Sequence, residues 1–145
     1  MSIFGHNAEE KIVAAEVACG GDASAPCQAV LYFRQDRQIT RRTESFLPFM
    51  VIEDERLLNG LTGKHSFQPL SGKSPLKVQV SFNSWAEWAR AKKWLLDKTR
   101  ISIGVPNAPF IILNDPVHQY LLFSGRTLFK GMNFDDVRRM QVDIE

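Results

Sequence analysis

The chain has 145 residues, a formal net charge of +2 and a hydrophobic content of 44%, which predict one globular domain with a real core or one small domain with an appendage. The charge is too small to indicate nucleic-acid binding by itself, so the distribution of basic residues matters more than their sum. No apolar run approaches the roughly 20 residues of a membrane-spanning helix, and residues 1–11 do not resemble a signal peptide. We therefore expect a cytoplasmic protein with no membrane partner.

The first 46 residues predict a small antiparallel β meander. Residues 1–10 are polar and unpatterned, so a loose start is expected. Residues 12–18 favour a strand, although their alanines would also suit a helix. Residues 28–34 predict a second strand, and residues 38–46 predict a third that returns antiparallel to it after a polar turn.

Two cysteines, Cys19 and Cys27, flank a glycine-containing loop and could face each other across it. A zinc site would need about four ligands, and the three histidines of the chain are scattered without ligand spacing. In the expected reducing compartment, two reduced and partly buried thiols are the favoured interpretation.

From residue 47 the pattern alternates between strand and helix. Residues 47–52 are apolar and strand-like, residues 53–60 predict a short helix, and residues 64–70 are a weaker strand candidate. Residues 76–82 alternate clearly, which predicts a half-buried strand. Its core face would carry Leu76, Val78, Val80 and Phe82, and its solvent face Lys77, Gln79 and Ser81.

The strongest helix signal begins at Ser84, whose hydroxyl can accept the backbone N–H of Glu87 while the Glu87 carboxylate reaches back in a capping box. The following tryptophans and leucines repeat at helical spacing, and we interpret the tryptophans as core residues. Residues 110–113 then predict another strand. The resulting order of strand, helix, strand, strand, helix, strand is that of the ferredoxin-like arrangement, a sheet covered on one side by two helices.

The predicted fold class is therefore α+β: a small antiparallel β meander, then a ferredoxin-like βαββαβ sheet, then a short helical crossover. In the crossover, Asp115 and Pro116 favour a helix start, Gly125 favours its end, and Asn133 favours the start of one further turn. An RNA-recognition version of the sheet is disfavoured because residues 76–82 lack exposed aromatics in a basic, glycine-rich strand.

The last residues predict a strand in which Asp143 and Glu145 project from the same face. Paired carboxylates can hold the divalent metals that assist phosphodiester hydrolysis, because such metals stabilise the attacking and leaving oxygens. Two ligands are not a complete site, since oxygen-ligand metals take about six ligands. We therefore expect this chain to be part of a longer protein.

With these pieces in order, the chain resembles the N-terminal region of family B DNA polymerases, the replicative and repair type of archaea and some bacteria. The triplet Asp143, Ile144 and Glu145 matches the first motif of the family's 3′–5′ proofreading exonuclease. The matching stretches cover about two thirds of the 145 residues, whereas the first 28 residues match nothing in the family. Besides the strand–helix order of residues 47–113, the resemblance rests on Asp115, Pro116, Tyr120, Leu121, the run from Gly125 to Met132, and the run from Met140 to Glu145.

The resemblance implies a division of the chain into units. Residues 1–46 would be the meander, 47–114 the ferredoxin-like subdomain, 115–139 a helical connector, and 140–145 the first strand of the exonuclease domain. Asp143 and Glu145 would bind Mg²⁺ or Mn²⁺ in the full-length polymerase, together with motifs further along the chain. This stretch would contain no complete catalytic site and would need no cofactor by itself.

The resemblance also implies a partner, single-stranded template DNA, besides the rest of the polymerase chain. The domain would help to hold the template through basic side chains on phosphates and aromatic side chains on bases. The candidate DNA-binding residues are Arg34, Arg37, Arg41, Arg42, Arg126 and Lys130. Two alternatives stay open: a stand-alone nucleic-acid-binding module of a nuclease, and a plain α+β interaction domain.

Archaeal members of the family also read template uracil in a pocket of this domain. The corresponding places here would be near residues 46–50, 78–80 and 115–120. The acidic Asp115 and the polar His118 do not suit a close-fitting apolar pocket, so uracil recognition is not predicted.

Overall fold

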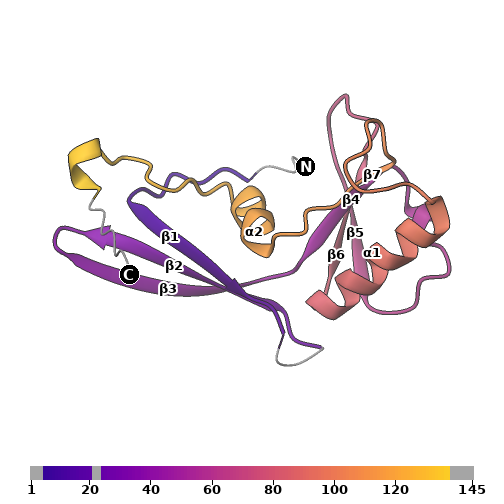
Figure 1. Ribbon diagram of the computed structural model, residues 1–145, viewed down its shortest axis with the longest axis horizontal. Coiled ribbons are helices and arrows are strands. Elements are labelled where there is room, and N and C mark those ends of the chain that lie inside the picture. The colour runs from indigo at the N-terminus through magenta and orange to yellow at the C-terminus, as the bar shows by residue number, and fades with distance from the viewer. Residues whose placement is uncertain (1–4, 21–23, 138–145) are drawn as a thin grey trace, which may run out of the picture.

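The computed structural model describes residues 5–20 and 24–137, which form two antiparallel sheets and two α-helices (Figure 1). The α+β class is thus confirmed. The two sheets lie next to each other along the long axis of the molecule. Neither helix is long and apolar enough to cross a membrane.

The first sheet is the predicted meander. It consists of β1 (Ile12–Ala18), β2 (Cys27–Gln35) and β3 (Gln38–Phe46), paired in that order. The register of β2 with β3 runs without a break from Cys27 opposite Phe46 to Gln35 opposite Gln38, so two residues alone form the turn. Asp36 in that turn has a φ of 52°, a conformation that Asp and Asn adopt more readily than most residues.

The second sheet contains β4 (Phe49–Ile52), β5 (His65–Pro69), β6 (Val78–Phe82) and β7 (Phe110–Ile111). Its spatial order is β5-β6-β4-β7, and all neighbours are antiparallel. Helix α1 (Trp85–Thr99) packs on one face. The core between them contains Met50, Ile52, Val80, Phe82, Trp88, Ala91 and Leu95.

The start of α1 follows the prediction in one half of the capping box. The Ser84 hydroxyl accepts the backbone N–H of Glu87 at 3.2 Å. The reciprocal bond is replaced, because Glu87 Oε1 accepts the backbone N–H of Lys64 instead. Glu87 therefore ties α1 to the start of β5 rather than to its own cap.

Several predicted elements are shorter than expected, including β5 and β6 at their ends. The helix predicted over residues 53–60 is a single 3₁₀ turn, η1 (Glu55–Leu58), in which only Leu58 is buried, so a longer helix would gain little core contact. The strand predicted from residue 47 starts at Phe49, and Leu47 is exposed. The strand predicted over residues 110–113 pairs only at its first two residues, opposite Ile52 and Val51.

The solvent face predicted for β6 is wrong at Gln79. Its side chain is 1% exposed, although the alternation itself is correct. Gln79 lies opposite Val51 in the register, and Val51 is also buried. Both residues are in the central strands of the sheet, so the face opposite α1 is shielded there as well. The alternation thus showed which residues of β6 share a face, but not that the face opposite α1 is also buried at Gln79.

The prediction of free thiols is also wrong, because Cys19 and Cys27 form a disulfide. The two residues extend the β1–β2 register by one step beyond Ala18 and Gln28, which places them directly opposite each other. Their Cα atoms are 4.4 Å apart, a separation that a disulfide can bridge. The hairpin itself thus brings the two sulfurs together.

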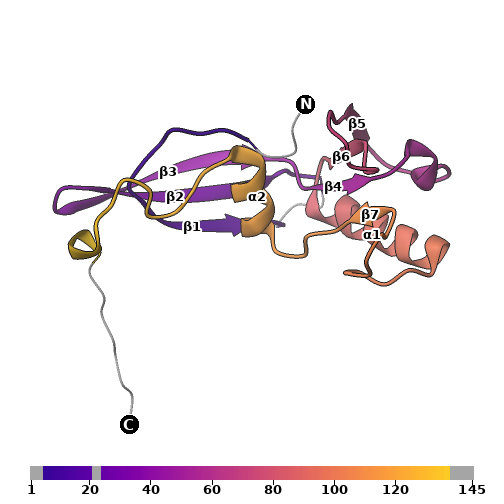
Figure 2. The same cartoon turned by 90° about the horizontal axis from the view of Figure 1, so that it is seen from above.

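Helix α2 (Pro116–Ser124) returns the chain to the first sheet. The predicted caps are present: the Asp115 side chain accepts the N–H of Val117, and Gly125 ends the helix with a φ of 70°. Tyr120 joins the core of the first sheet with Ile12, Leu31 and Phe46, and Figure 2 shows α2 lying over these strands. Beyond it, η2 (Phe134–Asp136) is the predicted single turn after Asn133.

Candidate nucleic-acid interface

The first sheet has one face covered by α2 and one that neither described α-helix covers (Figure 1). At one end of this second face, η2 lines a hollow together with Arg34 and Ile39. Directly opposite residues of an antiparallel pair share a face. We define the open face by the pairs Val30 with Thr43, Tyr32 with Arg41, and Arg34 with Ile39. The β2 residues of this face are half-buried, whereas Ile39, Arg41 and Thr43 are exposed.

Two of the predicted DNA-binding arginines, Arg34 and Arg41, lie on the open face. Arg37 follows in the β2–β3 turn, so all three are near the same end of the sheet. In the described part of the chain, none of the three guanidinium groups forms a hydrogen bond or an ion pair. No described residue therefore competes with an external anion for these groups.

Tyr32 contributes an aromatic ring beside these arginines. Its hydroxyl donates a hydrogen bond to Glu16 Oε2 at 3.3 Å, which connects β2 to β1 on the same face. The sequence analysis did not single out Tyr32. The signal that could have found it is the spacing of two residues to Arg34, which places both side chains on the same face of a strand.

Arg42 and Arg126, two further candidates, are instead engaged inside the protein. Arg42 faces α2 and pairs with Glu9 at 2.7 Å and with Glu44 at 3.1 Å. The side chain of Arg126 is only 10% exposed and pairs with the same two carboxylates, each at 2.8 Å. Arg126 also donates a hydrogen bond to the hydroxyl of Tyr120. These two arginines thus hold α2 against the first sheet.

The pKa values of this cluster follow from its pairing. A hydrogen bond from Arg42 lowers the pKa of Glu9, burial opposes the shift, and Arg126 adds to it. Burial raises the pKa of Tyr120, and the hydrogen bond to Glu44 raises it further. Burial would lower the pKa of Arg126, but the hydrogen bond to Glu9 and nearby negative charge raise it. At neutral pH, Glu9 and Arg126 are therefore charged and Tyr120 is neutral.

The lowered pKa of Glu9 predicts acid sensitivity. Its stabilising contribution is present above the ordinary glutamate pKa of 4.5 and is lost as the pH falls through the lower value of the folded state. We expect Glu9→Gln to cost about 1 kcal/mol at pH 7 and to flatten the loss of stability below about pH 4.5. Urea unfolding at pH 7, 5, 4 and 3 measures this, with the exposed Glu53→Gln as the control. If Glu9→Gln loses stability with falling pH as the parent chain does, the lowered pKa of Glu9 is not a cause of the acid sensitivity.

Lys130, the last candidate, is exposed but lies away from the open face. Its Nζ donates a hydrogen bond to the backbone oxygen of Asn7 at 3.1 Å. Backbone bonds from Lys11 to Lys130 and from Phe129 to Ile12 fix this segment along the beginning of β1. Lys130 is therefore not part of the cluster formed by Arg34, Arg37 and Arg41.

The predicted metal ligands Asp143 and Glu145 lie outside the described residues. Within residues 5–20 and 24–137, no group of three or more His, Cys, Asp or Glu side chains is arranged to hold a metal ion.

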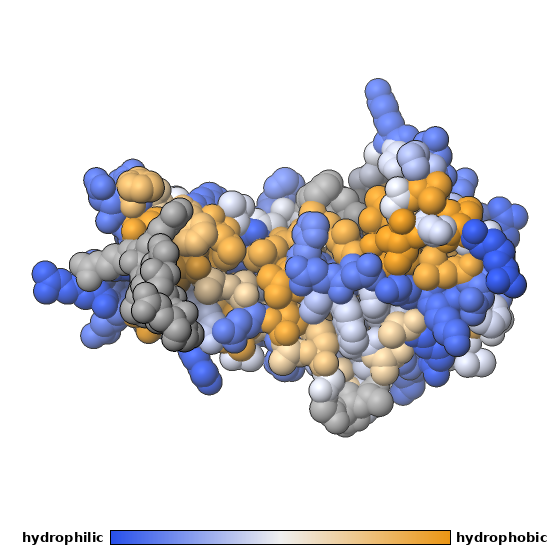
Figure 3. All heavy atoms as spheres, viewed as in Figure 1, coloured by the Kyte–Doolittle hydropathy of each residue, from blue (hydrophilic) through white to orange (hydrophobic). Residues whose placement is uncertain are grey.

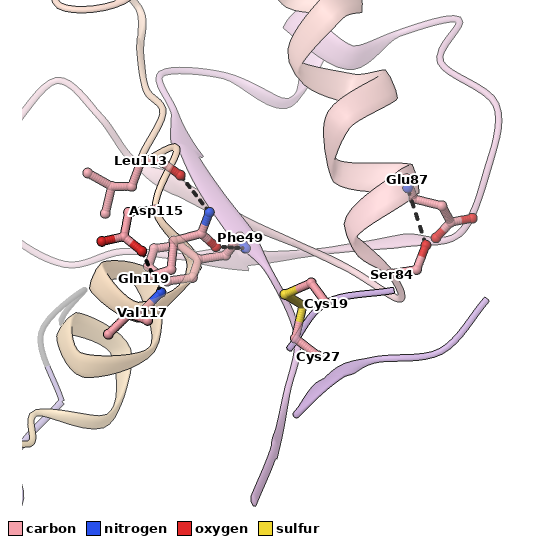
Figure 4. The surroundings of a disulfide bond; sticks show 9 residues. All are labelled: Cys19, Cys27, Phe49, Ser84, Glu87, Leu113, Asp115, Val117 and Gln119. Carbon is pink, nitrogen blue, oxygen red and sulfur yellow. Dashed lines mark hydrogen bonds between the residues drawn. A yellow bond between two sulfur atoms is a disulfide. The ribbon is translucent and has the colours of Figure 1, made fainter. Parts of the chain in front are cut away.

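A second set of polar contacts joins the two sheets, at positions that sequence analysis did not single out (Figure 4). The fully buried Gln119 accepts the backbone N–H of Phe49 at 2.8 Å and donates to the backbone oxygen of Leu113 at 2.7 Å. Trp88 Nε1 donates to the backbone oxygen of Phe49 at 3.0 Å. Gln119 thus uses its amide to connect α2 to β4, and these contacts are structural.

No protein-family model matches this chain, and no curated protein or solved structure is similar enough to count as a match. The polymerase resemblance therefore stays a prediction.

Proposed function

We propose that this chain is a non-catalytic N-terminal region of a family B DNA polymerase whose first sheet helps to hold single-stranded template DNA. The observation that carries this proposal is the group of three arginines without a partner among residues 5–20 and 24–137, namely Arg34, Arg37 and Arg41, beside Tyr32 on or next to the open face. Single-strand binding combines such basic groups with aromatic rings on which bases stack. Arg42 and Arg126 are excluded from this role by their carboxylate partners.

The second sheet supports the same proposal through its topology. Its order, β5-β6-β4-β7 with antiparallel neighbours, is the order expected for a ferredoxin-like unit. Helix α1 makes the second crossover, from β6 to β7, and η1 takes the place of the first helix. In the full-length polymerase, Asp143 and Glu145 would be ligands of Mg²⁺ or Mn²⁺ in the exonuclease.

Binding through the open face would be independent of sequence. Arginine–phosphate contacts carry no base identity, and every base offers a ring that can stack on Tyr32. Glu16 on the same face repels phosphate, so the strand would run on the side of Arg34 and Arg41, away from β1. Duplex DNA would compete poorly, because its bases are already stacked on one another.

Fluorescence anisotropy with a short labelled single strand tests the proposal across a range of salt concentrations. Three phosphate contacts predict a slope of log affinity against log salt of about −2, and Arg41→Ala should reduce its size by about 0.7. Lys93→Ala, which removes an exposed positive charge on α1, is the matched control and should change neither affinity nor slope. The proposal fails if the chain does not bind at low salt, or if the two variants lose affinity equally.

An α+β interaction domain is the second candidate, and a specific surface favours it. A hollow of about 560 Å³ lies at the arginine end of the first sheet, beside η2, where Figure 3 shows apolar atoms at the surface. Phe134 is 85% exposed there and Ile39 is 53% exposed, which is unusual for such large apolar side chains. The remaining lining residues include Val13, Arg34, Phe129, Met132 and Val137. A chain that fails to bind DNA in the titration would support this second candidate.

A further inference from the structure

We propose that Cys19 and Cys27 (Figure 4) form a reversible thiol–disulfide site, opened by a dithiol reductant, whose state changes the packing of Trp85 at the start of α1. This inference does not rest on DNA binding.

Reversibility follows from where the bond lies. Cys19 and Cys27 are directly opposite each other in a hairpin whose β1–β2 pairing extends from Ala18 with Gln28 to Ile12 with Phe33. The Cα separation of 4.4 Å is that of an ordinary non-hydrogen-bonded pair in an antiparallel sheet. Because the strands already hold the residues together, the fold survives reduction and keeps the two thiols adjacent for reoxidation.

Burial sets the direction of the exchange. Cys27 is fully buried, whereas Cys19 is partly exposed. A thiolate of the reductant therefore attacks Cys19 Sγ, and the electron pair of the broken S–S bond leaves with the Cys27 sulfur, which takes up a proton. The second thiol of the reductant then attacks the reductant's first sulfur, which is bonded to Cys19 Sγ in the mixed disulfide. This releases Cys19, which is protonated in turn, and the reductant leaves as a cyclic disulfide, so that two electrons and two protons are transferred.

The neighbours of the disulfide carry its state to the second sheet. Cys27 belongs to the buried cluster of the first sheet, and Cys19 and Trp85 both pack against this cluster. Trp85 also packs against the cluster of the second sheet and stacks on Trp88 with ring centroids 4.2 Å apart. Two unbonded sulfurs need a separation of about 3.5 Å or more instead of about 2 Å. Because Cys27 is fully buried in a close-packed cluster, we expect this expansion to shift adjacent side chains.

The test uses the full chain in its oxidised form. Dithiothreitol is added without denaturant while a thiol reagent counts free thiols and tryptophan fluorescence is recorded. We expect two thiols per chain to appear, the far-ultraviolet circular dichroism to persist, and the Tm to fall by roughly 5–10 °C. The fluorescence should change with thiol release and return on reoxidation.

Two variants distinguish this site from general effects of the reductant. Cys19→Ser combined with Cys27→Ala should remove every response to dithiothreitol. If this double variant folds poorly, Cys19→Ala alone, which keeps the buried sulfur, replaces it as the variant without a disulfide. Trp85→Phe should release thiols normally but lose most of the fluorescence change. The proposal is overturned if the chain prepared without reductant has two free thiols or if reduction requires denaturant. It is also overturned if reduction unfolds the chain or if the fluorescence does not respond to reduction.

Discussion

Arg126→Met is expected to lower the free energy of unfolding by about 2–3 kcal/mol, because it leaves the buried Tyr120 hydroxyl and two partly buried carboxylates with fewer partners. The side chain of Arg126 is 10% exposed, and its guanidinium contacts Glu9, Glu44 and the Tyr120 hydroxyl. Methionine keeps much of the side-chain length but donates no hydrogen bond. The two carboxylates would then share Arg42 as their remaining cation.

Arg42→Met is the matched control, since Arg42 pairs with the same two carboxylates from a side chain that is 44% exposed. Solvent screens such a pair, so its removal should cost less than about 1 kcal/mol. Urea unfolding at pH 7 measures both variants. Equal losses would mean that burial does not determine the contribution of Arg126. Under the proposed function, a folded Arg126→Met variant should bind single strands as the parent chain does.

The second large effect is expected for Gln119→Leu, with a loss of about 3 kcal/mol. The substitution leaves the N–H of Phe49 and the carbonyl of Leu113 without the side-chain amide that now pairs with both. Gln119 is fully buried, so water cannot easily take over either bond. The leucine gains apolar contact, but this offsets only part of the cost.

His118→Leu is the control for this variant, because the adjacent residue of α2 is exposed and its replacement should change stability by less than about 0.5 kcal/mol. Thermal unfolding compares the stability of the two variants, and amide hydrogen exchange reports on individual backbone N–H groups. The Phe49 amide should exchange faster in Gln119→Leu. If this variant is as stable as His118→Leu, the bridge between α2 and β4 contributes nothing.

Local signals predicted the fold well because they depend on neighbours in the sequence. The caps at Ser84, Asp115 and Gly125 are decided by side chains within a few residues of each helix end. The meander was also readable, since its three strands follow one another in the sequence, although the alanines of the first strand left a helix open as an alternative. The prediction failed at residues 53–60, where a helix-like composition forms only one 3₁₀ turn.

The candidate site was predictable only in part. Alternation separates Arg41 from Arg42 in β3, so the sequence could have placed them on opposite faces. It could not show which face α2 covers. The partners of Arg126 are 117 and 82 residues away in the chain, at Glu9 and Glu44. Contacts of that range depend on tertiary packing, which no local pattern encodes.

The return of α2 to the first sheet has a consequence for synthesis on the ribosome. The meander emerges before the second sheet, but its apolar face is covered by Tyr120 and Leu128, which follow only after the whole second sheet. At typical elongation rates, the nascent chain would expose Ile12, Leu31 and Phe46 for roughly 4–15 s. The meander is therefore made before the second sheet but completed after it, and during that interval its apolar face is a natural target for chaperones.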